Sequence, residues 1–138
     1  MDEHHPTVRM HLWLETEDGV FFGLGRLKLL ESIEASGSLK AAAISMGMSY
    51  RAAWGKIKRT ERVLGFALIE KTAGNRTGYR LTEAGILLKD SYRRWLDDVE
   101  RMALERGSQL LPCIPRKYSQ DGEGANGCDC LAGIASAV

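Results

Sequence analysis

Glycine and serine punctuate the chain at intervals that favour three short helices. Ser36-Gly37-Ser38 and Gly47-Met48-Ser49 separate three stretches with helical apolar spacing, and Gly65 closes the last of them. Glycine after a helix can take the left-handed conformation that ends it, and serine before a helix can cap its first amides. The sequence therefore predicts helices over about 26–36, 39–46 and 50–64.

The second and third of these helices are joined by residues 46–49 alone, so they form a helix-turn-helix. Helices that cross steeply need small side chains where they touch, and the run of three alanines at 41–43 supplies them. This pair of helices is the centre of the predicted fold.

Short β-forming stretches flank the helices. Residues 9–15 alternate in part, and Glu17-Asp18-Gly19 supplies a turn before a second short run at 20–22, which predicts an N-terminal hairpin. Further runs at 67–71 and 79–81 enclose a glycine-bearing loop with a basic tip. A basic hairpin directly after a helix-turn-helix is typical of the wing of a winged helix.

A long helix is predicted to begin at Glu83, capped by Thr82, and to run to about Arg106. Its large apolar residues are spaced 4, 3, 4, 3, as in a coiled-coil seam. The seam could cover the chain's own core or pair with a second copy. Pairing is favoured because two of its members are large aromatics. The predicted dimer-interface residues are Leu88, Tyr92, Trp95, Val99 and Met102.

These segments predict a mainly α fold with a small β component: a winged helix-turn-helix with an N-terminal β-hairpin and a long C-terminal dimerisation helix. Residues 1–8 are expected to be flexible, 9–107 to form the DNA-binding domain with its dimerisation helix at about 83–106, and 108–138 to be a disordered tail. The chain has neither an apolar run of about 18 residues nor a secretory start, so we expect a cytoplasmic protein without a membrane span.

Positive charge is concentrated in one part of the chain. Between Leu39 and Arg80 there are nine basic and two acidic residues, a net charge of +7, whereas residues 1–38 carry −4 and residues 81–138 carry −2. The formal total of +1 hides this polarity. Binding a phosphate backbone requires concentrated positive charge. A solvated basic face is the plainer alternative.

The helix at 50–64 separates into an apolar face and a basic face. Ala53, Trp54, Ile57 and Leu64 share the predicted inward face, with Trp54 interpreted as a core anchor. A basic row lies on another face, and such a helix suits insertion into a major groove.

Each residue of the basic face has a predicted role. Arg51 is the candidate for bidentate contact with guanine, while later basic residues neutralise phosphates. Gly55 would let the backbone come close to DNA, or serve packing against the preceding helix. The predicted residues that bind double-stranded DNA are Lys40, Ser49, Tyr50, Arg51, Gly55, Lys58, Arg59, Arg62, Arg76 and Arg80.

The stretch Gly47-Met48-Ser49-Tyr50-Arg51-Ala52-Ala53-Trp54 resembles the N-terminal DNA-binding domain of ModE-type molybdate-responsive regulators. Leu68-Ile69-Glu70-Lys71 and Leu81-Thr82-Glu83-Ala84-Gly85 are similar to the wing strands and linker helix of that family and of LysR-type winged helices. The resemblance covers about residues 20–105. It implies a winged helix, a homodimer and a two-fold operator. Molybdate sensing is not implied, because the oxyanion-binding domains of those regulators are not expected here.

Other classes of function fit the sequence less well. An enzyme is not expected, because no paired-carboxylate or phosphate-loop pattern is present and Gly23-Leu24-Gly25 lacks the third glycine of a dinucleotide loop. No cofactor or metal is predicted. A thiol- or metal-responsive regulator using Cys113, Cys128 and Cys130 stays open as an alternative. The serious runner-up is a winged helix that binds protein partners.

Overall fold

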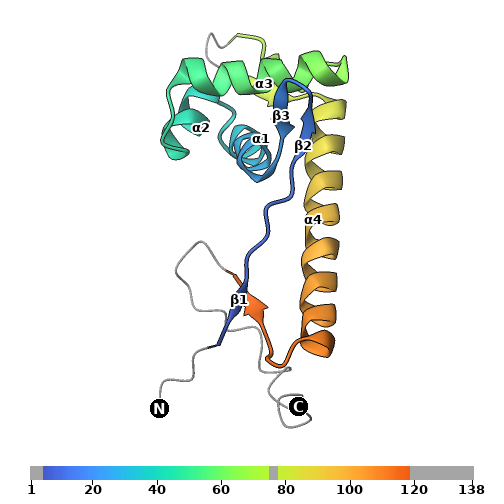
Figure 1. The fold of residues 1–138 in the computed structure, drawn as a ribbon. Coiled ribbons are helices and arrows are strands. Elements are labelled where there is room, and N and C mark those ends of the chain that lie inside the picture. Colours follow the sequence, from blue (N-terminus) through green and yellow to red (C-terminus); the bar gives the residue numbers. More distant parts are fainter. Residues whose placement is uncertain (1–4, 75–77, 119–138) are drawn as a thin grey trace. The chain divides into compact units, whose positions relative to one another are not determined.

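The computed structural model describes residues 5–74 and 78–118 (Figure 1). The chain divides into two compact units. One contains residues 11–94, and the other combines the residues up to 10 with those from 95 onward. Within the described residues, no helix is both long enough and apolar enough to cross a membrane.

The three predicted helices are present in the unit of residues 11–94. They are α1 (Leu24–Ser36), α2 (Leu39–Ser45) and α3 (Tyr50–Leu64). Gly37 and Gly65 end α1 and α3 with φ angles of 69° and 83°, the left-handed conformation that glycine tolerates best. The Ser38 and Ser49 hydroxyl oxygens each accept a hydrogen bond from the backbone amide three residues later in the chain, at 3.1 Å. Both serine caps and the bounds of α3 are confirmed, whereas α1 begins two residues earlier than predicted and α2 ends at Ser45, one residue before the predicted end.

The N-terminal hairpin is confirmed, but its first strand is shorter than predicted. Strand β2 (Leu14–Thr16) pairs antiparallel with β3 (Gly19–Phe22), and the register shifts between Leu14 and Glu15. The residues before Leu14 have no strand to pair with in this hairpin, because β3 ends at Phe22 and α1 begins at Leu24. The length of β2 is therefore limited by the length of its partner strand β3.

The two strands at the base of the predicted wing are also present. Strands β4 (Ile69–Lys71) and β5 (Tyr79–Leu81) are antiparallel neighbours. The Tyr79 amide donates to the Gly37 carbonyl at 3.0 Å, and Gly78 forms an isolated bridge with Ser38. The wing base is thus attached to the connection between α1 and α2. The loop residues 75–77 lie outside the described part of the chain.

The core of this unit is built around α1. Leu27, Leu30 and Ile33 of α1 are fully buried. The adjoining side chains of α2 and α3 are small where the helices meet, since Ala42, Ala43 and Ala53 are buried as well. Small residues at these positions allow the close crossing that a helix-turn-helix requires, as the alanine run predicts.

The long helix α4 (Glu83–Leu110) begins at the predicted residue and extends past the predicted end at Arg106. The Thr82 hydroxyl accepts the Gly85 amide at 3.0 Å and donates to the Ala67 carbonyl at 2.6 Å. A Cβ atom on Gly85 would lie 2.2 Å from the Leu68 carbonyl oxygen. Gly85 is therefore required where the start of α4 crosses the segment before β4.

Tyr92 of α4 corrects the predicted dimer seam. Its ring is 2% exposed and packs edge-on against Phe22, with 5.0 Å between ring centroids. The Tyr92 hydroxyl donates to the Leu12 carbonyl. The prediction that Tyr92 faces a second copy is wrong, because its ring fills the core beneath the hairpin. This is the alternative in which the seam covers the chain's own core.

Ion pairs also link α4 to α1. Arg93 Nη2 lies 2.7 Å from Glu31 Oε1, and Lys89 Nζ lies 2.9 Å from Glu34 Oε1. Hydrogen bonds from Lys89 to Asp90 and Glu34 raise the pKa of its ammonium group above the ordinary value. Apolar and ionic contacts together fix the start of α4 on α1.

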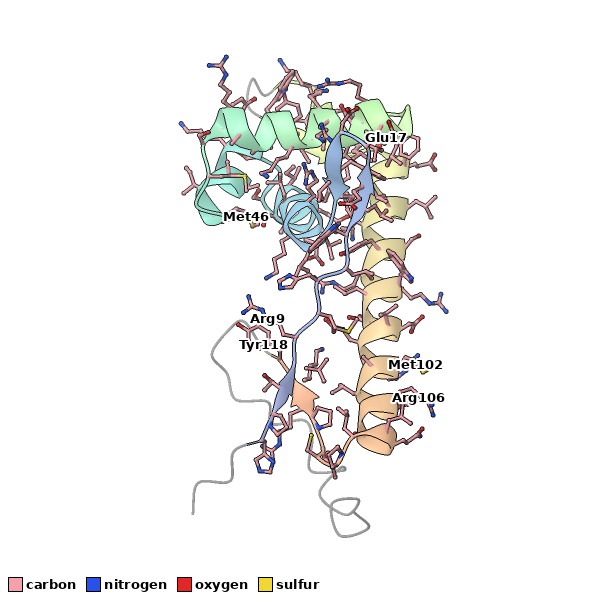
Figure 2. The ribbon with its side chains drawn as sticks, in the orientation of Figure 1. Arg9, Glu17, Met46, Met102, Arg106 and Tyr118 are labelled. Atoms are coloured by element: carbon pink, nitrogen blue, oxygen red, sulfur yellow. The ribbon has the colours of Figure 1, made fainter. Side chains whose placement is uncertain are left out.

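The second unit contains the two short parallel strands β1 (Thr7–Val8) and β6 (Arg116–Lys117). The Arg9 guanidinium lies 4.7 Å from the centroid of the Tyr118 ring, and Figure 2 shows the two side chains together. Part of the segment predicted as a tail is therefore a strand. Strand pairing over two residues leaves no periodic signal in the sequence. Residues 119–138 lie outside the described part of the chain.

Candidate nucleic-acid interface

Helix α3 buries one face and exposes the opposite one. Ala53, Ile57 and Thr60 are buried, and they recur every three or four residues along the inward side. Arg51, Gly55 and Arg62 lie on the outward side and are exposed. The predicted separation into an inner apolar face and an outer basic face is therefore present, although its members differ from the prediction.

Thr60 belongs to the inward face and was missed in the sequence. Its hydroxyl donates to the Phe21 carbonyl of β3, so the buried oxygen is satisfied. The signal was available, because Thr60 follows Ile57 by three residues and Ala53 by seven. A polar side chain at a core position is overlooked when only apolar residues are counted.

Trp54, predicted to anchor the core, is 43% exposed instead. It follows Ala53 by one residue, which rotates it about 100° around the helix from the centre of the buried face. The Lys58 ammonium lies 5.4 Å from the centroid of the Trp54 ring, in a cation–π contact. Trp54 therefore joins the solvent-facing residues of α3.

Gly55 has no packing role. Among the described residues, a Cβ atom built on it would meet no atom within 4 Å. This excludes one of the two interpretations open from the sequence, namely that Gly55 makes room for α2. Glycine inside an exposed helix costs about 1 kcal/mol relative to alanine. The fold gives no reason for that cost.

Lys58 is held by a fixed carboxylate. Its ammonium lies 2.8 Å from Glu61 Oε1. The other oxygen of Glu61 accepts the Leu68 amide at 2.7 Å and the Ile69 amide at 3.4 Å. Lys58 is therefore less available for a phosphate than the sequence suggests, because its charge is already paired.

Arg59 lies on the flank of α3 beside the hairpin. Its Nε donates to the Val20 carbonyl of β3 at 3.1 Å. Burial, and secondarily the nearby Arg59 charge, lowers the pKa of the Arg26 guanidinium. Arg59 therefore does not stand in one exposed row with Arg51 and Arg62, and its contact with the hairpin could not be read from helical spacing.

The remaining predicted residues occupy three places. Tyr50 opens α3, and a hydrogen bond with Tyr79 at the wing base is the main cause that raises the pKa of the Tyr50 hydroxyl. Arg80 of β5 pairs with Glu70 of β4 at 2.8 Å, and Lys40 is exposed in the first turn of α2. Arg76 lies outside the described residues.

The alternative metal site receives no support from the described part of the chain. Within residues 5–74 and 78–118, no group of three or more histidine, cysteine or acidic side chains is placed to hold a metal ion. Cys113 is an exposed free thiol. Cys128 and Cys130 lie outside the described residues, so the structure does not place them.

Comparison with known proteins identifies relatives of the helix-turn-helix. Residues 24–86 match the family of bacterial regulatory helix-turn-helix proteins of the lysR type. The chain is 35% identical over 100 residues to the molybdenum transport protein ModE of Azotobacter vinelandii, covering 71% of this chain and 37% of ModE. It is 38% identical over 65 residues to the molybdenum-pterin-binding protein MopA of Rhodobacter capsulatus, covering 46% of this chain and 24% of MopA.

A solved structure of a DNA-binding domain is also similar to this chain. The crystal structure of the CbnR DNA-binding domain in complex with DNA matches 61% of this chain and 92% of that domain, with 26% identity and a TM-score of 0.50. The chain spans little more than a third of the length of ModE. The predicted resemblance and fold class are confirmed: residues 24–86 are similar to the LysR-type helix-turn-helix, and the fold is a winged helix.

Proposed function

We propose that the protein is a sequence-specific transcriptional regulator that binds operator DNA as a dimer. Helix α3 enters the major groove, and the wing at 72–79 contacts the neighbouring backbone or minor groove. The LysR-type helix-turn-helix at 24–86 and the DNA-bound relative support this proposal. As a regulator, the protein would act beside the chromosome in the cytoplasm and would need no catalytic residues.

The outward face of α3 carries the proposal. Gly55 stands there between two exposed arginines, Arg51 one turn before it and Arg62 two turns after it. An exposed helical glycine that nothing contacts is explained if a large rigid surface comes against the helix at this point. The flanking guanidinium groups make a polyanion the best-matched surface.

The ion pairs divide the basic residues into two groups. Lys58 and Arg80 are paired with Glu61 and Glu70. Arg59 has no carboxylate partner either, but its guanidinium is engaged by the Val20 carbonyl. For five further basic residues on the helix-turn-helix and wing base, neither a carboxylate nor a carbonyl partner is found among the described residues, which leaves their charges for phosphates. These five are Lys40, Arg51, Lys56, Arg62 and Lys71. Arg51, near the start of α3, remains the residue proposed to contact guanine.

Dimerisation would use the exposed apolar residues of α4. Trp95 is 41% exposed and Met102 is 55% exposed, seven residues apart on one helix face. Met102 projects from the side of α4 turned away from β1 and β6 (Figure 2). Two copies related by a two-fold axis would present two α3 helices to a two-fold operator. With Tyr92 assigned to the core, Trp95 and Met102 are the main proposed contacts.

Selection of bound sequences from a random duplex pool tests the proposal. We expect the full chain to enrich a short two-fold sequence, and Arg51→Ala to lose about 1–3 kcal/mol on that sequence while its binding to unrelated duplex changes little. Arg101→Ala is the matched control, since Arg101 is an exposed arginine of α4 paired with Asp98. A pool that returns no enriched sequence would contradict the proposal.

A further inference from the structure

We propose that Trp54 reads thymine in the operator, with its indole ring against the C5-methyl group in the major groove. Lys58 acts as the residue that positions this ring. The inference rests on the proposed function and deepens it, because it names a base that the target sequence must contain and a residue that recognises it.

Exposure alone does not single out Trp54. Trp13 and Trp95 are exposed to similar extents, and isolated apolar residues on a surface need no explanation. Trp54 differs in its place, because it directly precedes Gly55, lies three residues after Arg51, and is exposed together with both of them on α3. A ligand that approaches Gly55 closely enough to require glycine also meets the Trp54 ring.

A sequence of contacts holds the Trp54 ring in place. The Lys58 ammonium covers one side of the ring at 5.4 Å from its centroid. Lys58 is in turn fixed by Glu61 at 2.8 Å. The Glu61 carboxylate is anchored by the backbone amides of Leu68 and Ile69, before and within β4. Ordering a side chain before binding reduces the entropy lost when the complex forms.

The indole matches the thymine edge better than the edges of the other bases. Thymine presents the O4 acceptor beside an apolar methyl group in the major groove, whereas cytosine presents an amino donor and guanine has acceptors without a methyl group. Indole combines an apolar body with a single N–H donor. Among the described residues, no hydrogen-bond acceptor is recorded for the Trp54 N–H. A donor beside an apolar surface is the pattern that O4 and the methyl group complement.

The spacing of Arg51 and Trp54 constrains the sequence further. Residues three apart on a helix have Cβ atoms about 5–6 Å apart, and successive bases on a strand rise 3.4 Å, so the two side chains reach bases roughly one or two steps apart. We therefore expect the enriched half-site to contain a guanine and a thymine within about two base pairs. Arg51 contacts the guanine and Trp54 contacts the thymine.

Replacement of thymine by deoxyuridine tests the inference, because this change removes only the methyl group. On the enriched duplex, substitution of the thymine under Trp54 should weaken binding of the full chain about fourfold, the effect expected for burying one methyl group. With Trp54→Ala, thymine and uracil at that position should bind equally. Trp54→Phe should retain part of the preference, and circular dichroism checks that both variants are folded.

Lys58 and Arg62 provide matched variants that separate positioning from charge. Lys58→Gln should lower the thymine-to-uracil preference, and Lys58→Arg should restore it. Arg62→Ala should reduce the salt dependence of binding and leave the preference unchanged. An equal uracil penalty in the full chain and in Trp54→Ala would overturn the inference while the proposed function stands. A pool without any enriched sequence would overturn both.

Discussion

Replacement of Gly55 by alanine should change stability and DNA binding in opposite directions. Gly55 lies inside α3, and its missing Cβ would touch no protein atom within 4 Å. Alanine therefore adds helix propensity and removes unfolded-state entropy without a clash, which is worth about 0.5–1 kcal/mol. For a chain of this length, that gain raises the melting temperature by about 2–5 °C.

The same methyl group stands on the surface proposed to enter the major groove. Inserting a methyl group into a well-fitted contact costs about 1–3 kcal/mol, or roughly 5- to 150-fold in Kd. Calorimetry would measure the stability of the variant, and fluorescence anisotropy with the enriched duplex would measure its affinity. The expected result is a more stable protein that binds DNA more weakly.

Gly25→Ala is the matched control. Gly25 lies in the first turn of α1, outside the helix proposed to enter the groove, and among the described residues its added Cβ would also meet no atom within 4 Å. This variant should be as stable as the wild type or slightly more stable, with unchanged DNA binding. If Gly55→Ala bound the enriched duplex with wild-type affinity, the assignment of the outward face of α3 to the DNA contact would be refuted.

Three further changes test other parts of the structure. Gly85→Ala should destabilise the protein by about 2 kcal/mol or more, because its Cβ would lie 2.2 Å from the Leu68 carbonyl oxygen; a wild-type melting temperature would show that this crossing relaxes freely. Trp95→Glu should yield monomers in sedimentation, with Arg101→Ala as the dimeric control; a dimeric Trp95→Glu variant would exclude Trp95 from the interface. Tyr50→Phe should change stability little in chemical denaturation, because the Tyr50 side chain is 44% exposed and water can replace its hydrogen bond with Tyr79; a large loss of stability would show that this bond holds the wing base on α3.

The features predicted correctly from the sequence are those set by neighbouring residues. Ser49 caps α3 through an amide three residues away, and Gly65 ends the same helix through its own backbone conformation. Such interactions are complete within one turn of chain, so the residue types alone reveal them. The resemblance to LysR-type helix-turn-helix proteins was visible for the same reason, because the two helices and their turn are contiguous in the sequence.

The features predicted wrongly depend on residues far away in the chain. Tyr92 is buried by Phe22 and bonded to Leu12, some 70 to 80 residues earlier. Arg59 of α3 turns toward the Val20 carbonyl of β3, 39 residues earlier. Helical spacing gives the angular position of a side chain around the helix axis, but it does not reveal which residue from a distant part of the chain contacts that side chain.

The salt dependence of duplex binding tests the central claim most directly, since the claim is that the exposed basic residues of the helix-turn-helix and wing base neutralise phosphates. Anisotropy with the full chain between about 50 and 200 mM salt should give a logarithmic slope of roughly −4 per protomer, as expected for four or five phosphate contacts. Arg62→Ala should make the slope shallower by about one unit. Binding that stayed constant over this range would contradict the account.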